Sequence, residues 1–191
     1  MTDGPAKGEG AHMIVSSRSN ERVKQARKLL LRKERKHTGL HLIEGEKLVR
    51  EAVLSGARIQ TCFLEDGYAF DAPAAVSLLV VSRDVLESLC ESQTPQGVVA
   101  AVETPSLDPP ETYPGGLIVL LDGVQDPGNV GTILRSADAF GAAGVLLSPE
   151  CADPYAPKTL RAAMGSTYHL PVWQGDLPGE LSRLQSQEFS A

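Results

Sequence analysis

The sequence has few cysteines, few aromatic residues and no long apolar run. Its 191 residues include three cysteines, and 5% are aromatic. The cysteines lie far apart and form no C-x-x-C pair, which argues against a disulfide framework or a zinc site and favours a reducing cytoplasm. The apolar run at 117–121 is far shorter than the roughly 20 residues of a membrane span, and the N-terminus lacks the apolar region of a secretory signal. These absences exclude membrane, secreted and metal-finger proteins, and the length allows one ordinary domain or two small ones.

Positive charge is scarce overall but concentrated in one segment. The net charge is −6, yet residues 18–36 contain nine basic and two acidic residues, a local charge of +7. Val23, Ala26, Leu29 and Leu30 recur at helical spacing, so the sequence predicts a basic amphipathic helix with an N-cap at Ser19 or Asn20, in a region that ends at Gly39. This surface is either simply solvated or binds nucleic-acid phosphates.

Strands and helices of moderate length alternate along the chain, which indicates an α/β fold. A segment at 104–116 holds four prolines and paired glycines, and is the best candidate for a linker between domains. The pattern predicts strands at 40–44, 59–64, 77–81, 98–102, 117–121 and 144–147, and helices at 46–55, 83–92, 128–140 and 177–184.

The most informative stretch is a strand, a polar loop and a helix at 117–140. Asp126 is the expected N-cap of the helix, and Pro127 suits its first position. In open α/β sheets ligands bind beyond the carboxyl ends of the strands, so this loop is a candidate site. No phosphate-binding loop or dinucleotide fingerprint is present. G-x-S-x-G is also missing, so we expect Ser136 to be a surface serine and His169 to lie at a strand end.

The motif Asn129-x-Gly131-x-x-x-Arg135-x-Ala137-x-x-x-Gly141 follows D-x-x-x-D-P-G and closely resembles the first signature of the TrmH/SpoU-type RNA 2′-O-ribose methyltransferases. These enzymes belong to the SPOUT superfamily. The segment at 158–172 is similar to the family's connecting segment. The segments at 42–48 and 92–99 resemble its L30e-like substrate-binding domain.

The resemblance implies an N-terminal L30e-like RNA substrate-binding domain at 12–104 and a partial SPOUT domain at 117–191. The second domain would have a parallel sheet and the α/β-knot topology. A flexible tail at 1–11 would precede them, and residues 105–116 would link them. The Glu44-Gly45-Glu46 element resembles the first domain's signature, with carboxylates that are structural rather than catalytic.

The resemblance also implies an activity, namely methyl transfer from S-adenosylmethionine to a ribose 2′-hydroxyl of RNA, with 23S ribosomal RNA favoured. Arg135 matches the catalytic arginine and would stabilise the developing alkoxide, since a guanidinium stays protonated. Its alternative role is a surface pair with Asp138 or Thr132. Asn129 would position RNA or, alternatively, cap the helix. Gly131 is expected to permit close packing.

In this interpretation the basic region of the first domain contacts RNA backbone phosphates, and no metal is expected. The family resemblance further implies a cytoplasmic homodimer. The residues assigned to RNA contact are Arg18, Arg22, Arg27, Lys28, Arg32 and Lys33.

The family's second and third motifs, a G-x-E loop and an S-L-N turn, are not found after Val172. We therefore expect a chain that stops before the knot, with an incomplete cofactor pocket whose residues stay unknown. The helix at 177–184 would have an apolar face without its neighbouring strand. The alternative interpretation is a non-catalytic RNA-binding protein that retains the substrate domain.

Overall fold

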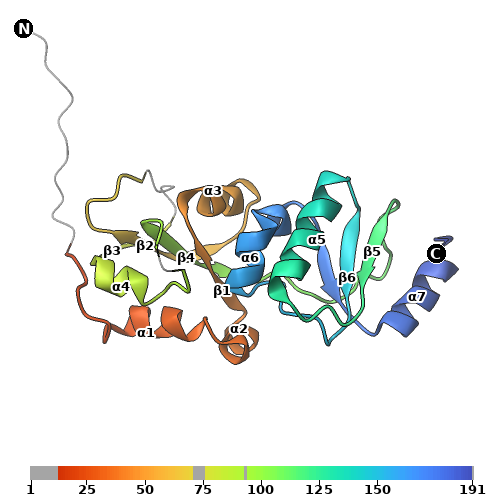
Figure 1. Ribbon diagram of the computed structural model, residues 1–191, viewed down its shortest axis with the longest axis horizontal. Coiled ribbons are helices and arrows are strands. Elements are labelled where there is room, and N and C mark those ends of the chain that lie inside the picture. The colour runs from red at the N-terminus through yellow and green to blue at the C-terminus, as the bar shows by residue number, and fades with distance from the viewer. Residues whose placement is uncertain (1–12, 71–75, 93, 191) are drawn as a thin grey trace, which may run out of the picture.

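The computed structural model describes residues 13–70, 76–92 and 94–190, and these form two α/β units that lie side by side (Figure 1). The tail predicted at 1–11 lies outside the described residues, as does Gln93 within the segment at 92–99. We refer to residues 13–103 as the N-terminal unit and to residues 118–190 as the C-terminal unit. Residues 104–117 are the connecting segment. Among the described residues, no helix has the length and apolar character of a membrane span.

The N-terminal unit is a mixed sheet covered by helices. Its four strands have the order β1-β4-β2-β3, with β4 antiparallel to β1 and β2, and β3 parallel to β2. The central strand β4 is buried along almost its whole length. Each predicted element is present, although the helix expected at 83–92 ends early. The bounds are β1 Leu40–Glu44, α3 Glu46–Leu54, β2 Ile59–Glu65, β3 Leu78–Val81, α4 Arg83–Glu87 and β4 Val98–Glu103.

The basic segment forms two helices, α1 (Glu21–Lys28) and α2 (Arg32–Thr38), so the prediction of one continuous helix is wrong. Asn20 is the N-cap of α1, and Gly39, at φ 66°, ends α2 as expected. The break at residues 29–31 has a specific cause. The Arg35 guanidinium donates to the carbonyl oxygens of Leu29 and Leu30, both at 2.8 Å, and these carbonyls would otherwise continue the helical ladder.

The C-terminal unit is built on a parallel sheet of order β5-β6-β7. The two faces of the buried strand β6 are covered differently, because alternate side chains point to opposite sides. Val145 and Leu147 pack with residues of α5, whereas Leu146 packs with Leu184 of α7. The bounds are β5 Ile118–Leu121, α5 Pro127–Ala139, β6 Gly144–Leu147, α6 Pro157–Ala163, the 3₁₀ helix η1 Ser166–Tyr168, β7 Val172–Gln174 and α7 Leu177–Ser186.

Close packing of α5 on α6 depends on Gly131. A Cβ atom at this position would lie 2.4 Å from the Thr159 carbonyl oxygen and 2.6 Å from the Ala162 Cβ. Real Cβ atoms do not approach this closely, so only glycine allows the two helices to touch here. The expectation that Gly131 permits close packing is confirmed.

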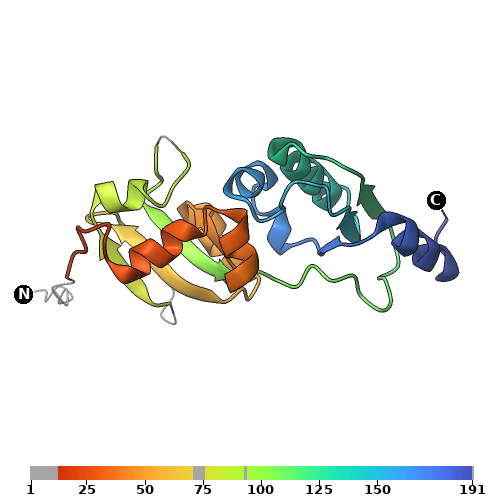
Figure 2. The same cartoon turned by 90° about the horizontal axis from the view of Figure 1, so that it is seen from below.

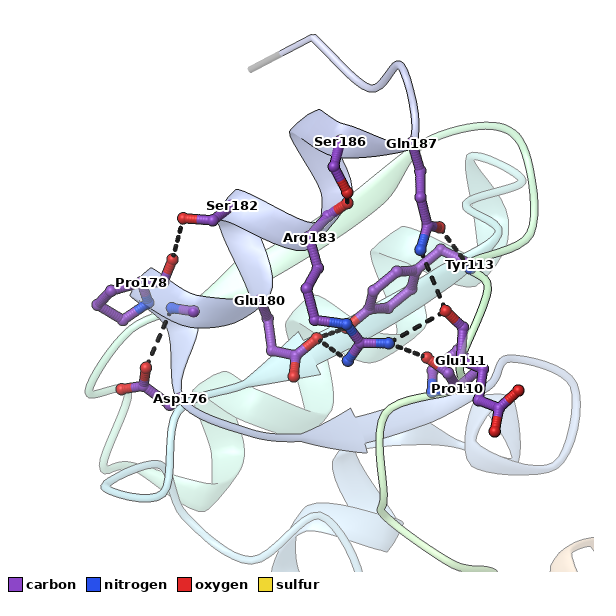
Figure 3. A network of polar contacts seen from close by, with 11 residues as sticks. Pro110, Glu111, Tyr113, Asp176, Pro178, Glu180, Ser182, Arg183, Ser186 and Gln187 are labelled. Carbon is purple, nitrogen blue, oxygen red and sulfur yellow. Dashed lines mark hydrogen bonds and ion pairs between the residues drawn. The ribbon is translucent and has the colours of Figure 1, made fainter.

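The helix predicted at 177–184 is confirmed as α7, but its apolar face is not left uncovered. Leu184 is buried against Tyr113 of the connecting segment and Trp173 of β7. Arg183 donates to the Glu180 carboxylate and to the Pro110 carbonyl, each at 2.6 Å (Figure 3). The Tyr113 hydroxyl donates to the same carboxylate at 2.6 Å. The connecting segment therefore covers the helix face that was expected to lack a partner.

The two units share a hydrophobic cluster and a buried ion pair. Tyr155 and Leu160 of the C-terminal unit pack with Ile43 of β1. Beside them Arg35, only 7% exposed, donates through Nε and Nη2 to one oxygen of Asp153, at 2.9 and 2.8 Å. Apolar packing and a charge-assisted pair thus join α2 and β1 to the loop before α6.

His41 lies fully buried at this junction. Its Nδ1 is hydrogen-bonded to the Thr104 hydroxyl at 2.9 Å and its Nε2 to the Tyr168 hydroxyl at 3.1 Å. Burial lowers the pKa of His41 to about 3, with Asp153 opposing this effect and Arg35 adding to it. The imidazole is therefore neutral near pH 7 and serves as a bridge between β1, the connecting segment and η1.

We predict that Gly131→Ala destabilises the protein by about 1–3 kcal/mol, because the new methyl group meets the backbone of α6. Urea unfolding followed by circular dichroism measures the change. Gly115→Ala is the matched control, because a Cβ there meets nothing within 4 Å. Equal stability of the two variants would show that the α5–α6 contact does not need glycine.

We predict that His41 makes the folded state sensitive to acid. The unfolded histidine binds a proton near its ordinary pKa of 6.5, whereas the folded one does so near 3. Its contribution is complete above about pH 6.5 and falls by at most about 1.4 kcal/mol per pH unit as the pH drops toward 3. The unfolding free energy is measured from pH 4 to 7. In His41→Gln its dependence on pH should be smaller by this amount. His37→Gln, at an exposed histidine, is the control for replacing a histidine by glutamine.

Candidate active site and nucleic-acid interface

The loop from β5 to α5 is organised by Asp126. Its carboxylate accepts a hydrogen bond from the Asn129 backbone N–H at 2.9 Å and lies 3.2 Å from the Lys158 ammonium of α6. These two donors, the backbone N–H first, lower the pKa of the exposed Asp126 carboxyl. Pro127 occupies the first turn, so the predicted cap is confirmed. The start of α5 is thus held against α6.

Asn129 presents an exposed side chain in the first turn of α5. The side-chain cap comes from Asp126, and only the backbone N–H of Asn129 takes part in it. Within the described ranges, the Asn129 amide has no hydrogen-bond partner. The alternative role as a capping side chain is therefore wrong, and the amide is open to a ligand.

Arg135 is exposed on α5, and both partners proposed for it are engaged elsewhere. The Asp138 carboxylate lies 3.3 Å from His169 Nδ1, and the Thr132 hydroxyl donates to the Gly128 carbonyl at 2.8 Å. Arg135 makes no ion pair with any residue that the structure describes. The alternative of a surface pair is therefore wrong, and the guanidinium is free to meet a substrate.

The structure exposes both Asn129 and Arg135 but does not bring them together. Six residues along an α-helix correspond to about 9 Å of rise and to directions about 120° apart. A ligand in contact with both side chains would have to follow the helix for almost two turns. Such a ligand is extended, as a nucleic-acid strand is.

The loops beyond β5, β6 and β7 are tied to one another. The Gly123 N–H donates to the Ser148 hydroxyl at 3.0 Å, and the Gln174 amide donates to the Ser148 carbonyl at 3.2 Å. The Cys151 thiol donates to the Leu121 carbonyl at 3.2 Å. This edge of the sheet therefore forms a fixed frame beside the start of α5.

The six basic residues assigned to RNA contact all have exposed side chains, spread from the segment before α1 to the start of α2. Arg18 donates to the Asp84 carbonyl at 3.1 Å. Arg22 lines a groove of about 590 Å³ between α1 and the sheet. Arg35 differs, because its guanidinium is buried and paired with Asp153. The basic segment therefore divides into exposed cations and one buried structural arginine.

Sequence reasoning missed the bridging role of His169. It follows η1 and precedes β7, and its ring nitrogens lie 3.1 Å from the Glu51 carboxylate of α3 and 3.3 Å from that of Asp138. These carboxylates, Glu51 first, raise the pKa of His169. No local pattern could have revealed the bridge, because Glu51 is 118 residues away in the chain.

Other polar residues of the sequence have structural partners. The Ser136 hydroxyl is exposed and donates to the Thr132 carbonyl, as expected of a surface serine. Glu44 accepts from Ser92 at 2.5 Å and Glu46 pairs with Arg50 at 2.7 Å, in keeping with structural carboxylates. Across the described parts of the chain, no three His, Cys, Asp or Glu residues cluster as metal ligands would.

Two family models match this chain. The MRM3-like substrate binding domain matches residues 20–100, and the SpoU rRNA Methylase family matches residues 116–191. The first match contains α1, α2 and strands β1 to β3, and it ends within β4. The second contains α5 with Asn129 and Arg135.

The sequence is also similar to named methyltransferases. It is 35% identical over 175 residues to the 23S rRNA (guanosine(2553)-2′-O)-methyltransferase RlmP of Bacillus subtilis, covering 91% of this chain and 69% of the relative. It is 34% identical over 150 residues to the human rRNA methyltransferase 3, mitochondrial, covering 72% of this chain and 36% of the relative. The chain thus spans about two thirds of one relative and about one third of the other.

Solved structures share the arrangement of both units. One is the SpoU methyltransferase AviRb from Streptomyces viridochromogenes in complex with AdoMet, which is 31% identical in sequence with a TM-score of 0.79. The matched region covers 88% of this chain and 68% of the AviRb chain. An AdoMet-bound rRNA methyltransferase from Sinorhizobium meliloti has a TM-score of 0.79 at 33% identity, covering 91% and 68%. An N-terminal substrate-binding domain is followed here by a parallel-sheet methylase domain, and the chain belongs to the SpoU rRNA methylase family.

Proposed function

We propose that this chain serves in the methylation of ribose 2′-hydroxyls in ribosomal RNA, with S-adenosylmethionine as the methyl donor. The RlmP and AviRb resemblances support the reaction and the donor. The proposal includes the division made from the sequence, with 12–104 for substrate binding and 117–191 for catalysis. By family resemblance the proposal extends to 23S rRNA as substrate and to a cytoplasmic homodimer.

One observation carries the proposal. The Arg135 guanidinium, within the family's motif on α5, is exposed and makes no ion pair with the described residues. A ribose hydroxyl becomes a good nucleophile as it loses its proton to water, and its oxygen then carries negative charge until the bond to the methyl carbon forms and the donor's methyl–sulfur bond breaks. A guanidinium remains protonated at neutral pH and can stabilise that charge without accepting a proton. Asn129, nearer the start of the same helix, would hold a neighbouring part of the RNA strand.

S-adenosylmethionine would supply the methyl group, and the carboxyl edge of the sheet is where a parallel sheet would hold it. The Ser148 hydroxyl accepts from Gly123, and the Gln174 amide donates to the Ser148 carbonyl. These two hydrogen bonds hold the edge together and do not by themselves identify the groups that would bind the cofactor. We therefore assign no residue of this chain to hold it.

The exposed cations of the basic segment would also suit a second candidate function, a non-catalytic RNA-binding protein. Filter binding of labelled S-adenosylmethionine separates the two. Saturable binding supports the enzyme. Retained RNA binding without saturable cofactor binding identifies the alternative.

We predict that Arg135→Ala lowers methyl transfer to ribosomal RNA by about 10²-fold, because one preorganised charge at the developing alkoxide is lost. Transfer of labelled methyl groups from S-adenosylmethionine measures the rate, with RNA affinity measured in parallel. Arg58→Ala, at an arginine that is 83% exposed in the N-terminal unit, is the control. Unchanged transfer in the Arg135 variant would contradict the role assigned to its guanidinium.

We predict that reversing two exposed charges of α1, Arg27→Glu with Lys28→Glu, weakens RNA binding at every sequence tested. Each lost phosphate contact lowers the slope of log affinity against log salt concentration by about 0.9 for duplex and about 0.7 for single strands. Fluorescence anisotropy with an rRNA fragment at several salt concentrations gives the slope. Arg27→Glu alone is also measured, and Arg58→Glu, a single charge reversal at an exposed arginine outside the basic segment, is its charge-matched control. An unchanged slope in the double variant would mean that these cations are simply solvated.

A further inference from the structure

A crevice of about 210 Å³ lies between the two units. Arg32 and Lys36 of α2 line one side, and Pro105 of the connecting segment lines another. Asp153 and Gln174 contribute the wall from the C-terminal unit. In both views α2 lies at the end of the N-terminal unit nearest the C-terminal unit (Figures 1 and 2). We call this space the interdomain crevice.

The charges around the interdomain crevice do not cancel. The single carboxylate on its lining, that of Asp153, is neutralised by the Arg35 guanidinium at 2.8 Å. Arg32 and Lys36 are exposed and make no ion pair with any residue in the described ranges. The crevice therefore carries an excess of two positive charges, and its complementary ligand is an anion.

The crevice also lies where parallel sheets bind ligands. Gln174 ends β7, and Asp153 lies in the loop that follows β6, so both wall residues stand beyond the carboxyl ends of parallel strands. Asp153 is connected to the candidate catalytic helix α5 through Thr159 of α6. The Thr159 hydroxyl donates to the Asp153 carbonyl at 2.8 Å, and the backbone of Thr159 packs on Gly131 of α5.

We infer that the interdomain crevice binds a phosphate group of the substrate RNA, through Arg32 and Lys36, against the wall formed by the C-terminal unit. This inference rests on the proposed function for the identity of the RNA. The two cations act on one phosphate, whereas the cations of α1 lie along the remaining backbone. RNA bound in this way contacts both units at once, which sets its position relative to α5.

The test places a negative charge in the crevice without altering the helices. Pro105 is exposed and lines the crevice, whereas the adjacent exposed Ser106 does not. Pro105→Glu should weaken binding of an rRNA fragment at least about fivefold and reduce its salt dependence. Ser106→Glu adds the same charge one residue away and should change affinity much less. Pro105→Ala separates the loss of proline from the gain of charge.

A second probe separates this inference from the proposed function. Pyrophosphate should raise the thermal midpoint of the wild type, but not that of Arg32→Ala with Lys36→Ala. If pyrophosphate stabilises only the wild type while no RNA binds, the crevice is an anion site and the proposed RNA function fails. If RNA binds the wild type but Pro105→Glu and Ser106→Glu weaken binding equally, the crevice assignment is overturned and the proposed function remains. Absence of both pyrophosphate and RNA binding overturns both.

Discussion

The Arg35 guanidinium binds three residues, and the rest of the arrangement depends on these contacts. It donates to the carbonyls of Leu29 and Leu30, which separates α1 from α2, and it pairs with Asp153 across the junction of the two units. A buried arginine is costly unless its donors are matched, and here four donor contacts are used. Loss of this side chain would leave Asp153 as an unpaired, largely buried carboxylate.

The same junction connects the proposed phosphate site at α2 to the candidate catalytic helix α5. Arg32 and Lys36, on α2 with Arg35, face a wall that contains Asp153. Asp153 in turn accepts from Thr159 of α6, the helix that packs closely on α5 at Gly131. Buried contacts of this kind fix the position of one unit relative to the other. A phosphate bound at α2 would therefore lie at a defined distance from Arg135.

Local patterns predicted most of the fold. Asp126 and Pro127 identified the start of α5, because capping geometry depends on residues three positions apart. Strand positions followed from short apolar runs, which are nearly sufficient for buried parallel strands. The basic segment shows the limit of this reasoning. Its helical periodicity was correct, but the break at residues 29–31 depends on Arg35 hydrogen bonds that periodicity does not encode.

The sequence by itself determined the α/β class, the motif on α5 and the concentration of positive charge, since each depends on residues close together in the chain. Only the tertiary structure decided which of those charges are available to a ligand. Arg35 is buried because a carboxylate 118 residues away lies beside it, whereas Arg32 remains exposed one turn earlier. Likewise, the Asp138 carboxylate contacts His169 from a distant segment, and Arg135 has no ion-pair partner among the described residues. Contacts between distant segments depend on how the two units pack, and no local pattern carries that information.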